Sequence, residues 1–393
     1  MILTETPPVG LFDRGYTLLT GATGQIGTYL LRDILLAQKP LAVVVRASGK
    51  QSGQQRIDGI ISKWESEIGR DLARPVCLEG DTTREYFGLS QRDRQWVRDH
   101  CSTLIHNAAS VAFGKRNVAG STWDTNVSSA KRVVELCQYA NIDHLAYVST
   151  AYVCGEHQGT YYEHELNLGQ TFRNEYEHSK LAAEQIVREF NAAGACTIFR
   201  PSIVVGDYQT GQTASFQGFY RLVQFTNSIA GLADRFDDGT WRHNVRLTLT
   251  GNEKRNFVTV DWVSAVMTRI VYDTQWHGQT YHLTPRTATT TREIEDALQQ
   301  YFRYHGVQFV GPILLDENDK SVEEKRFYEY LSEYNDYWQN DPVFDRSNTD
   351  KATELVEEGR VDVDCLYRMI DFAVDNGFGR QRRKKKRDAE SKC

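Results

Sequence analysis

The sequence lacks cysteine pairs, long apolar runs and an excess of positive charge. Its seven cysteines are odd in number and none forms a CxxC pair, so neither a disulfide framework nor a zinc cluster is indicated and no metal is expected. The longest aliphatic run is about as long as residues 41–45, far below the roughly 18 residues that span a bilayer. The net charge of −6 argues against a general nucleic-acid binder, because affinity for phosphate comes mostly from accumulated positive charge.

An export signal is also missing, since the N-terminal residues show no basic start followed by an apolar run. Together with the unpaired cysteines, this predicts a protein of the reducing cytoplasm. Apolar material is plentiful, with 40% hydrophobic and 11% aromatic residues in a chain of 393. The chain can therefore fill a sizeable core and is expected to be globular.

Charge is unevenly distributed along the chain. Residues 380–393 contain eight Lys/Arg and two Asp/Glu, so this tail carries +6 and the remaining chain −12. We interpret residues 377–393 as a basic, disordered end. The functional alternative is attraction of the tail to an acidic carrier protein or to an anionic membrane surface, a peripheral contact without a transmembrane segment.

From residue 16 to about 200, short β-branched apolar runs alternate with longer helical patterns, which predicts a parallel sheet wrapped by helices. The expected strands lie near 16–20, 41–45, 75–79, 103–107, 145–149 and 196–200. The expected helices lie near 25–37, 52–67, 90–99, 122–139 and 176–192. Continuous apolar strands are typical of a sheet buried on both faces, so the fold class is α/β, a Rossmann-type doubly wound parallel sheet.

After residue 200 this alternation stops, and a smaller, mostly helical substrate-binding region is expected to interleave with the sheet. The predicted division is an NADP-binding Rossmann domain over 14–206 plus 254–285 and a substrate-binding region over 207–253 plus 286–376. The elements expected here are helices near 216–225, 261–273, 291–304, 323–339, 349–358 and 362–375, and strands near 245–250 and 281–284. Thr290 and Glu293 predict a capping box at the start of the helix over 291–304.

The first expected strand runs into the turn TGATGQIG at residues 20–27, which has a GxxGxxG spacing and opens a helix. Gly21 permits a tight turn, Gly24 lets the backbone approach a pyrophosphate, and Gly27 permits close packing of helix and strand. The helix N-terminus adds N–H donors and positive potential. The motif predicts a dinucleotide site, with further contacts from Thr23, Gln25 and Ile26.

The residue after the second expected strand indicates which dinucleotide binds. An acidic side chain there accepts hydrogen bonds from a ribose 2′-OH, whereas an arginine pairs with a 2′-phosphate. Here the residue is Arg46, no Asp or Glu occurs between Asp33 and Asp58, and Arg56 adds a second basic group. NADPH is therefore favoured over NADH; the alternative is that Arg46 only solvates a strand end.

Two other strand ends offer cofactor contacts. Asp81, followed by Thr82, is placed to accept a hydrogen bond from an adenine amino group. The small residues after the fourth expected strand suit a close approach of the chain to the cofactor, and they are Asn107, Ala108 and Ala109.

The fifth expected strand ends at Thr150, and Tyr176 and Lys180 follow with a YxxxK spacing. Residues four apart share a helix face, so Lys180 can place its charge near the Tyr176 phenol. Lowering the pKa of a tyrosine from about 10 to about 7 requires roughly 4 kcal/mol of preferential phenolate stabilisation. A partly buried ammonium together with the positive charge of a nicotinamide is the expected source. Thr150 is preferred to Ser149, whose side chain points to the opposite face. Asn126 is expected to help orient Lys180, and the alternative for Tyr176 and Lys180 is an ordinary surface pair.

The segments TGATGQIG, VVVR, HNAASV, VSTAYV, YEHSK, FRPSIVVGD and NFVTVDWV resemble the extended short-chain dehydrogenase/reductases over residues 14–285. Within them, the chain is similar to the thioester reductase and fatty acyl-CoA reductase group, with its male-sterility-like NAD-binding domain. The resemblance implies that Thr150, Tyr176 and Lys180 take the hydroxyl, acid and lysine roles. It also places Pro201 and Ile203 beside the cofactor. The expected substrate contacts are Ser110, Ala151, Phe216, Phe219 and Tyr220, although aromatic stripes of this kind are more often core.

The resemblance implies NADPH-dependent reduction of an acyl thioester, carried by coenzyme A or a carrier protein, to an aldehyde. Whether a second round in the same pocket gives an alcohol is left open. About fifteen residues precede the first expected strand, so no adenylation or carrier domain is expected there and the acyl group would arrive on a separate carrier. The alternatives are an epimerase, dehydratase or alcohol dehydrogenase acting on a sugar nucleotide or sterol-like substrate, and a non-catalytic NADP-binding redox sensor. The oligomeric state is left open.

Overall fold

The computed structural model describes residues 14–111, 122–189, 195–313, 315–332, 337 and 341–379. The tail over 380–393 lies outside the described residues, as does most of the second half of the helix expected over 323–339. Within the described residues, none of the helices combines the length and apolar character that a membrane span requires.

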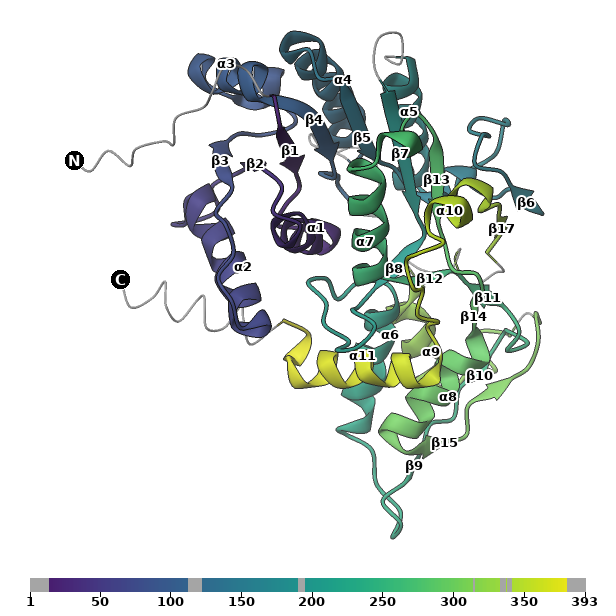
Figure 1. Cartoon of the computed structure of the whole chain (residues 1–393). Coiled ribbons are helices and arrows are strands. Elements are labelled where there is room, and N and C mark those ends of the chain that lie inside the picture. The colour runs from purple at the N-terminus through teal and green to yellow at the C-terminus, as the bar shows by residue number, and fades with distance from the viewer. Residues whose placement is uncertain are drawn as a thin grey trace.

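A seven-stranded parallel sheet forms the centre of the molecule (Figure 1). Its order is β13-β7-β5-β4-β1-β2-β3, with bounds Thr280–Leu283, Ala195–Pro201, His144–Val148, Cys101–His106, Tyr16–Thr20, Leu41–Val45 and Val76–Glu79. The strand order reverses at β1, which lies between β4 and β2. Ligands of open α/β sheets bind at this reversal, outside the carboxyl ends of the strands. The predicted doubly wound α/β fold is confirmed.

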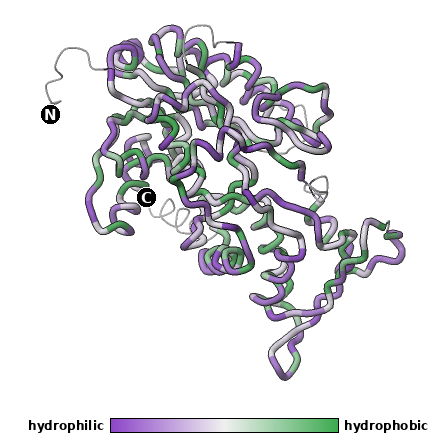
Figure 2. Tube along the Cα trace, turned by 45° about the vertical axis from the view of Figure 1, so that its right-hand side comes forward, coloured by the Kyte–Doolittle hydropathy of each residue, from purple (hydrophilic) through white to green (hydrophobic). Residues whose placement is uncertain are grey.

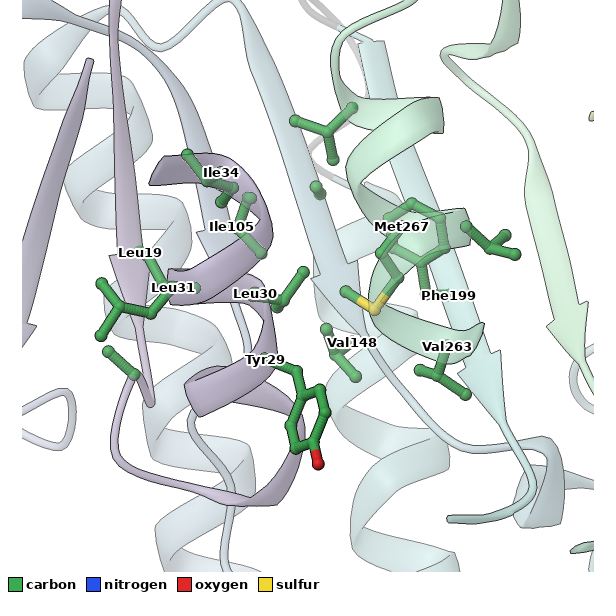
Figure 3. Packing of buried hydrophobic residues seen from close by; sticks show 14 of the residues in the cluster. Leu19, Tyr29, Leu30, Leu31, Ile34, Ile105, Val148, Phe199, Val263 and Met267 are labelled. Carbon is green, nitrogen blue, oxygen red and sulfur yellow. The ribbon is translucent and has the colours of Figure 1, made fainter. Parts of the chain in front are cut away.

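The strand side chains alternate between two cores, which explains why the strands are continuously apolar. One core contains Leu19 and Val43 with helices α1 (Gln25–Leu36), α2 (Gly53–Ile68) and α7 (Val260–Val271). The opposite core contains Leu18 and Val44 with α3 (Gln91–His100), α4 (Thr122–Ala140) and α5 (Glu175–Glu189). Figure 3 shows the first core, in which side chains of α1 and α7 cover the sheet.

A third core lies beyond the carboxyl ends of the sheet. It is built by α6 (Phe219–Ala230), α8 (Thr291–Phe302) and α11 (Val363–Asp375), which Figure 1 places below the sheet. The parallel pair β8 (Ile203–Val205) and β12 (Phe257–Thr259) connects it to the sheet. Figure 2 shows this part projecting from the body of the molecule, with hydrophobic residues interspersed along its elements.

Short elements complete the fold, and they lie both around the third core and beside the sheet (Figure 1). They are the strands β9 (Trp241–Arg242), β10 (Arg246–Leu247), β11 (Lys254–Arg255), β14 (Thr289–Thr290), β15 (Tyr304–His305), β16 (Gln308–Phe309) and β17 (Val343–Phe344), with β6 (Thr160–Tyr161) from the first half, and the helices α9 (Val322–Tyr330) and α10 (Ser347–Ala352). The capping box is confirmed, since Thr290 Oγ1 accepts from Glu293 N at 3.2 Å and Glu293 Oε2 accepts from Thr290 N at 2.8 Å. The division into two domains stays a prediction, and Ala352 of α10 belongs to the first sheet core.

Three elements are shorter than predicted. The helix expected over 323–339 is α9, which ends at Tyr330. The strand expected over 245–250 forms regular pairing only at β10, although Leu247 and Leu249 carbonyls still accept from Val310 and Gly311 amides. The helix expected over 349–358 begins earlier and ends at Ala352. Its start is displaced because the Glu163 carboxylate, distant in sequence, accepts a hydrogen bond from the Asn348 amide at 2.6 Å.

Candidate active site

The turn between β1 and α1 has a backbone that only glycine fits. Gly21 has φ +71°, and a Cβ there would lie 2.8 Å from the Ala108 amide nitrogen. A Cβ at Gly27 would lie 1.9 Å from the Gly21 carbonyl oxygen. Gly24 is the N-cap of α1 and carries no side chain that could occupy the helix N-terminus. The turn therefore presents a bare, electropositive helix end, which suits the pyrophosphate of a dinucleotide.

The edge formed by β1 and β4 holds this turn in place. Thr20 Oγ1 accepts from the Asn107 and Ala108 amides at 3.2 and 3.3 Å, and Asn107 Nδ2 donates to the Gly21 carbonyl at 3.2 Å. Thr20 Oγ1 also lies 2.9 Å from Nδ1 of buried His106. Burial, and secondarily the charge of Lys180, lowers the pKa of His106 to about 3, so this imidazole is neutral. Asn107 and Ala108 thus shape the predicted cofactor turn.

Basic groups gather beside the same turn, at the position predicted for a 2′-phosphate. Arg56 donates from Nη2 to Thr23 Oγ1 at 3.1 Å and from Nη1 to the Arg46 carbonyl at 2.6 Å. The Arg46 guanidinium is exposed and lies 3.6 Å from Asp81 Oδ2. The Arg56 guanidinium therefore lies between the Thr23 hydroxyl of the turn and the backbone of Arg46, and such cationic and hydroxyl donors can pair with a phosphate.

The other predicted cofactor residues are placed less simply. Asp81 Oδ1 accepts from Thr83 N and Oγ1 at 3.0 and 2.8 Å, so this carboxylate shapes its own turn and pairs with Arg46. Thr82 is half-buried. The Gln25 side chain is used inside the protein, since its Oε1 accepts from the Ala214 amide at 2.6 Å. The predicted residues that line the cavity described below are Gln25, Ile26, Asn107, Ala109, Pro201 and Ile203.

Thr150, Tyr176 and Lys180 line one cavity at the carboxyl end of β5. Lys180 Nζ donates to the Val148 carbonyl at 2.7 Å and lies 4.8 Å above the Tyr147 ring. Thr150 Oγ1 donates to the Pro201 carbonyl at 3.3 Å. The β5 backbone therefore fixes the Lys180 ammonium at the wall of the cavity that Tyr176 also lines.

The protein's own groups raise the pKa of Tyr176, whereas the predicted lowering also depends on the positive charge of a nicotinamide and stays a prediction. Burial raises the pKa of Tyr176 to about 12, and a hydrogen bond with Thr150 offsets this only in part. Burial also lowers the pKa of Lys180 to about 8. Desolvation dominates both pKa shifts because both side chains are buried. Tyr176 consequently keeps its proton at neutral pH and can donate it.

Asn126 acts on the residues beside Lys180 rather than on the ammonium. Its Oδ1 accepts from the Ser110 amide at 2.9 Å, and its Nδ2 donates to the Ser110 carbonyl at 3.1 Å and to Ser179 Oγ at 2.9 Å. The side chain thus ties the loop after β4 to the helix that carries Tyr176. Ser110, predicted as a substrate contact, is engaged in this link.

The cavity has a volume of about 390 Å³ and extends from the cofactor turn into the third core. Phe219 and Tyr220 line it, as predicted. Phe216 does not belong to the lining; its ring packs edge-on against Phe378, 6.1 Å between centroids. Ala151 is wholly buried in a separate cluster behind the strand end. The 3₁₀ turn that follows Thr150 points Ala151 away from the cavity, so these two predicted contacts are wrong.

A buried charged group next to Thr150 was not predicted from the sequence. The Tyr152 phenol donates to Asp341 Oδ2 at 2.9 Å, and the Asn256 amide donates to the same oxygen at 2.8 Å. Arg255 Nη1 lies 3.8 Å from Asp341 Oδ1 and, like Tyr152, lines the cavity. Asp341 is 189 residues from Tyr152 along the chain. No local pattern marks such a contact, although Arg255 adjoins the NFVTVDWV segment.

A second missed group surrounds the start of α5. Glu177 is wholly buried, and its Oε1 accepts from the Tyr337 phenol at 2.8 Å. Arg173 lies 3.5 Å from the same carboxylate oxygen. Tyr337, which also lines the cavity, thereby connects the C-terminal part of the chain to the helix of Tyr176. The acidic residue next to Tyr176 was visible in sequence, but its burial was not.

The model of the family described as male sterility protein matches residues 19–267. The nonribosomal peptide synthetase asaC of Aspergillus flavus is 25% identical over 351 residues, covering 86% of this chain and 31% of that protein. The aldehyde reductase lnaA of the same organism is 23% identical over 381 residues, covering 88% of this chain and 34% of that protein. The chain spans about a third of the length of these curated relatives.

The solved structure of the terminal R domain from the myxalamid PKS-NRPS biosynthetic pathway is similar over its whole length. It has a TM-score of 0.73 and 24% identity, with 95% of this chain and 93% of that chain covered. This likeness confirms the fold. The family match and the relatives together confirm the resemblance drawn from the motifs.

Proposed function

The chain belongs to the male sterility protein family of NAD-binding domains, and on this premise we propose that it reduces an acyl thioester to an aldehyde with NADPH. One observation carries the proposal. The hydroxyls of Thr150 and Tyr176 and the ammonium of Lys180 open into the same cavity that continues, lined by apolar side chains, into the third core. That cavity suits a reactive carbonyl attached to a long, mainly apolar chain.

The glycine turn, with Gly21, Gly24 and Gly27, would hold a nicotinamide dinucleotide, which would supply a hydride for the thioester carbonyl carbon. Tyr176 donates its phenolic proton to the carbonyl oxygen. The Thr150 hydroxyl turns from the Pro201 carbonyl to donate its hydrogen bond to that oxygen as negative charge develops. The product is a hemithioacetal, whose C–S bond breaks as its hydroxyl proton passes to sulfur, releasing an aldehyde and a thiol. Lys180 stabilises the phenolate left on Tyr176.

The carrier of the acyl group is also part of the proposal. The curated relatives are longer proteins, and one of them is named a nonribosomal peptide synthetase. We infer that the substrate arrives on coenzyme A or on a carrier protein, with the thioester at Thr150 and the chain extending past Phe219 and Tyr220. The basic residues over 380–393 would favour an acidic carrier, an attraction that salt screens.

The function is tested with a panel of acyl-CoA and acyl-carrier thioesters incubated with NADPH. We expect consumption of NADPH together with release of one thiol and one aldehyde per turnover. The measurements are loss of NADPH absorbance, thiol titration and identification of the product. Turnover of a sugar nucleotide without net consumption of NADPH would instead indicate an epimerase.

Cofactor choice gives a separate prediction. Because Arg46, Arg56 and Thr23 gather beside the glycine turn, NADPH should bind at least tenfold more tightly than NADH, about 1.4 kcal/mol. Arg46→Asp should erode or reverse this ranking, since a carboxylate repels a 2′-phosphate and accepts from a 2′-OH. Calorimetric titration measures both affinities. Arg92→Asp, an exposed change on α3, is the control and should leave the ranking intact. Equal affinities of the wild-type protein for both cofactors would contradict the assignment.

A further inference from the structure

Three polar side chains line the cavity in the third core, away from the residues used in the proposed reaction. Glu295 comes from α8, where it shares the cavity-facing side with Thr291, Ile294 and Leu298. Tyr304 comes from β15 and His243 from the segment after β9. Figure 1 places α8, β9 and β15 at the opposite end of the molecule from α5. The remaining lining of this part is mainly apolar, including Leu222, Val245, Leu247, Leu249 and Val307.

The carboxyl of Glu295 is incompletely bonded. Its Oε1 is buried and, among the described residues, has no hydrogen-bond partner. The Tyr304 phenol lies close enough to the same carboxyl for the two groups to shift each other's pKa. The ring of Tyr304 lies edge-on to that of His243, 5.3 Å between centroids, and His243 Nδ1 lies 2.5 Å from Glu323 Oε1. The three side chains therefore form one polar group, and one of its oxygens lacks a partner. A buried polar atom without a partner destabilises the protein unless something bonds to it.

The protonation of the group restricts what can bond to it. Burial raises the pKa of Glu295 to about 8, with a smaller contribution from Asp296. Burial lowers the pKa of His243 despite the nearby Glu323, and burial together with Glu295 raises that of Tyr304. At neutral pH the carboxyl, the imidazole and the phenol are therefore mainly uncharged. Uncharged donors and acceptors pair better with a neutral polar group than with an ion that must lose its hydration.

We propose that Glu295, together with Tyr304 and His243, selects acyl chains that carry a hydroxyl group remote from the thioester. This inference rests on the proposed function, because that function places the thioester at Thr150 and Tyr176. A chain ending in a methyl group would leave Glu295 Oε1 without a partner, whereas a hydroxyl would bond to it. Glu295 acts here as a specificity-determining residue and takes no part in the reaction.

The test compares saturated acyl-CoA thioesters, from butyryl to dodecanoyl, with matching ω-hydroxy and ω-amino chains. At the length that reaches Glu295, wild-type protein should prefer the ω-hydroxy chain by about tenfold in kcat/KM, equivalent to 1.4 kcal/mol. Glu295→Leu should abolish this preference through KM and leave butyryl-CoA turnover unchanged. Glu295→Gln, which keeps an uncharged hydrogen-bonding group, should retain it. Asp296→Asn, an exposed neighbour on the same helix, is the matched control.

A wild-type preference for the methyl-ended or ω-amino chain would overturn the inference, as would an unchanged preference in Glu295→Leu. If no thioester is reduced, the proposed function fails while the inference is still testable by binding. For this purpose, calorimetry compares ω-hydroxyoctanoic with octanoic acid in wild-type and Glu295→Leu protein. Tighter binding of the hydroxy acid by the wild type alone supports the role of Glu295. Equal binding in both proteins contradicts it.

Discussion

Replacement of Tyr176 by Phe should lower turnover on an acyl thioester by about a hundredfold or more, the usual contribution of a general acid. The phenol is buried, its pKa is raised to about 12, and it shares the cavity with Thr150 and Lys180. It therefore holds its proton at neutral pH and can transfer it to the carbonyl oxygen. Steady-state kinetics measure the loss. Binding of NADPH, followed by calorimetry, should change little because the ring itself remains.

Tyr367→Phe is the matched control for this prediction. Tyr367 lies on α11 with 40% of its surface exposed, so loss of its hydroxyl should leave turnover unchanged. A Tyr176→Phe protein that kept most of its activity would show that another group donates the proton. Tyr152 and Tyr337, which also line the cavity, would then be the next residues to test.

Replacement of Arg200 by Met should lower the free energy of unfolding by about 3–5 kcal/mol, because it leaves a buried carboxylate without its main partner. Arg200 is wholly buried, and its guanidinium donates to Glu184 Oε2 at 3.2 Å and to Oε1 at 2.8 Å. It also donates to the Glu165 carbonyl at 2.7 Å. Burial alone would raise the pKa of Glu184, but Arg200 outweighs it and the pKa is lowered. Urea unfolding at neutral pH measures the difference.

Arg188→Met serves as the comparison, because Arg188 binds the same Glu184 oxygen at 2.9 Å but is one-third exposed. Arg188→Met should lower the free energy of unfolding much less than Arg200→Met, since an ion pair with a partly exposed partner contributes less. The depressed pKa of Glu184 makes this contribution present above its unfolded-state pKa, and it is lost as the pH falls through the lower folded-state value. The difference between the two variants should therefore narrow in acid. Equal losses for both variants would contradict the assigned importance of Arg200.

The Arg200–Glu184 ion pair also lies next to the proposed active site. Arg200 lies at the end of β7, directly before Pro201, whose carbonyl accepts the Thr150 hydroxyl at 3.3 Å. Loss of the hydrogen bonds of Arg200 should therefore displace Pro201 and, with it, Thr150. Arg200→Met is expected to lower activity even below its unfolding transition, while Arg188→Met is not.

Much of the fold follows from local sequence pattern. Six expected strands coincide closely with those of the sheet, because a strand buried on both faces is apolar at most positions. The glycine turn was equally predictable from its spacing, since Gly21 and Gly27 occupy positions where any Cβ would collide with neighbouring backbone. The spacing of Tyr176 and Lys180 places both on one helix face, and both line the cavity. Steric limits on the backbone and the periodicity of side chains act over a few residues, so a short stretch of sequence is enough to predict them.

Only the tertiary structure decided the electrostatics and the shape of the cavity. Burial raises the pKa of Tyr176 and lowers that of Lys180, and how much water each side chain loses depends on the packed chain. The contact of Tyr152 with Asp341 joins residues 189 positions apart. Phe216 and Phe219 looked equivalent in sequence, yet only Phe219 lines the cavity. Desolvation and long-range contacts are properties of the packed chain, because they depend on which distant segments surround a side chain.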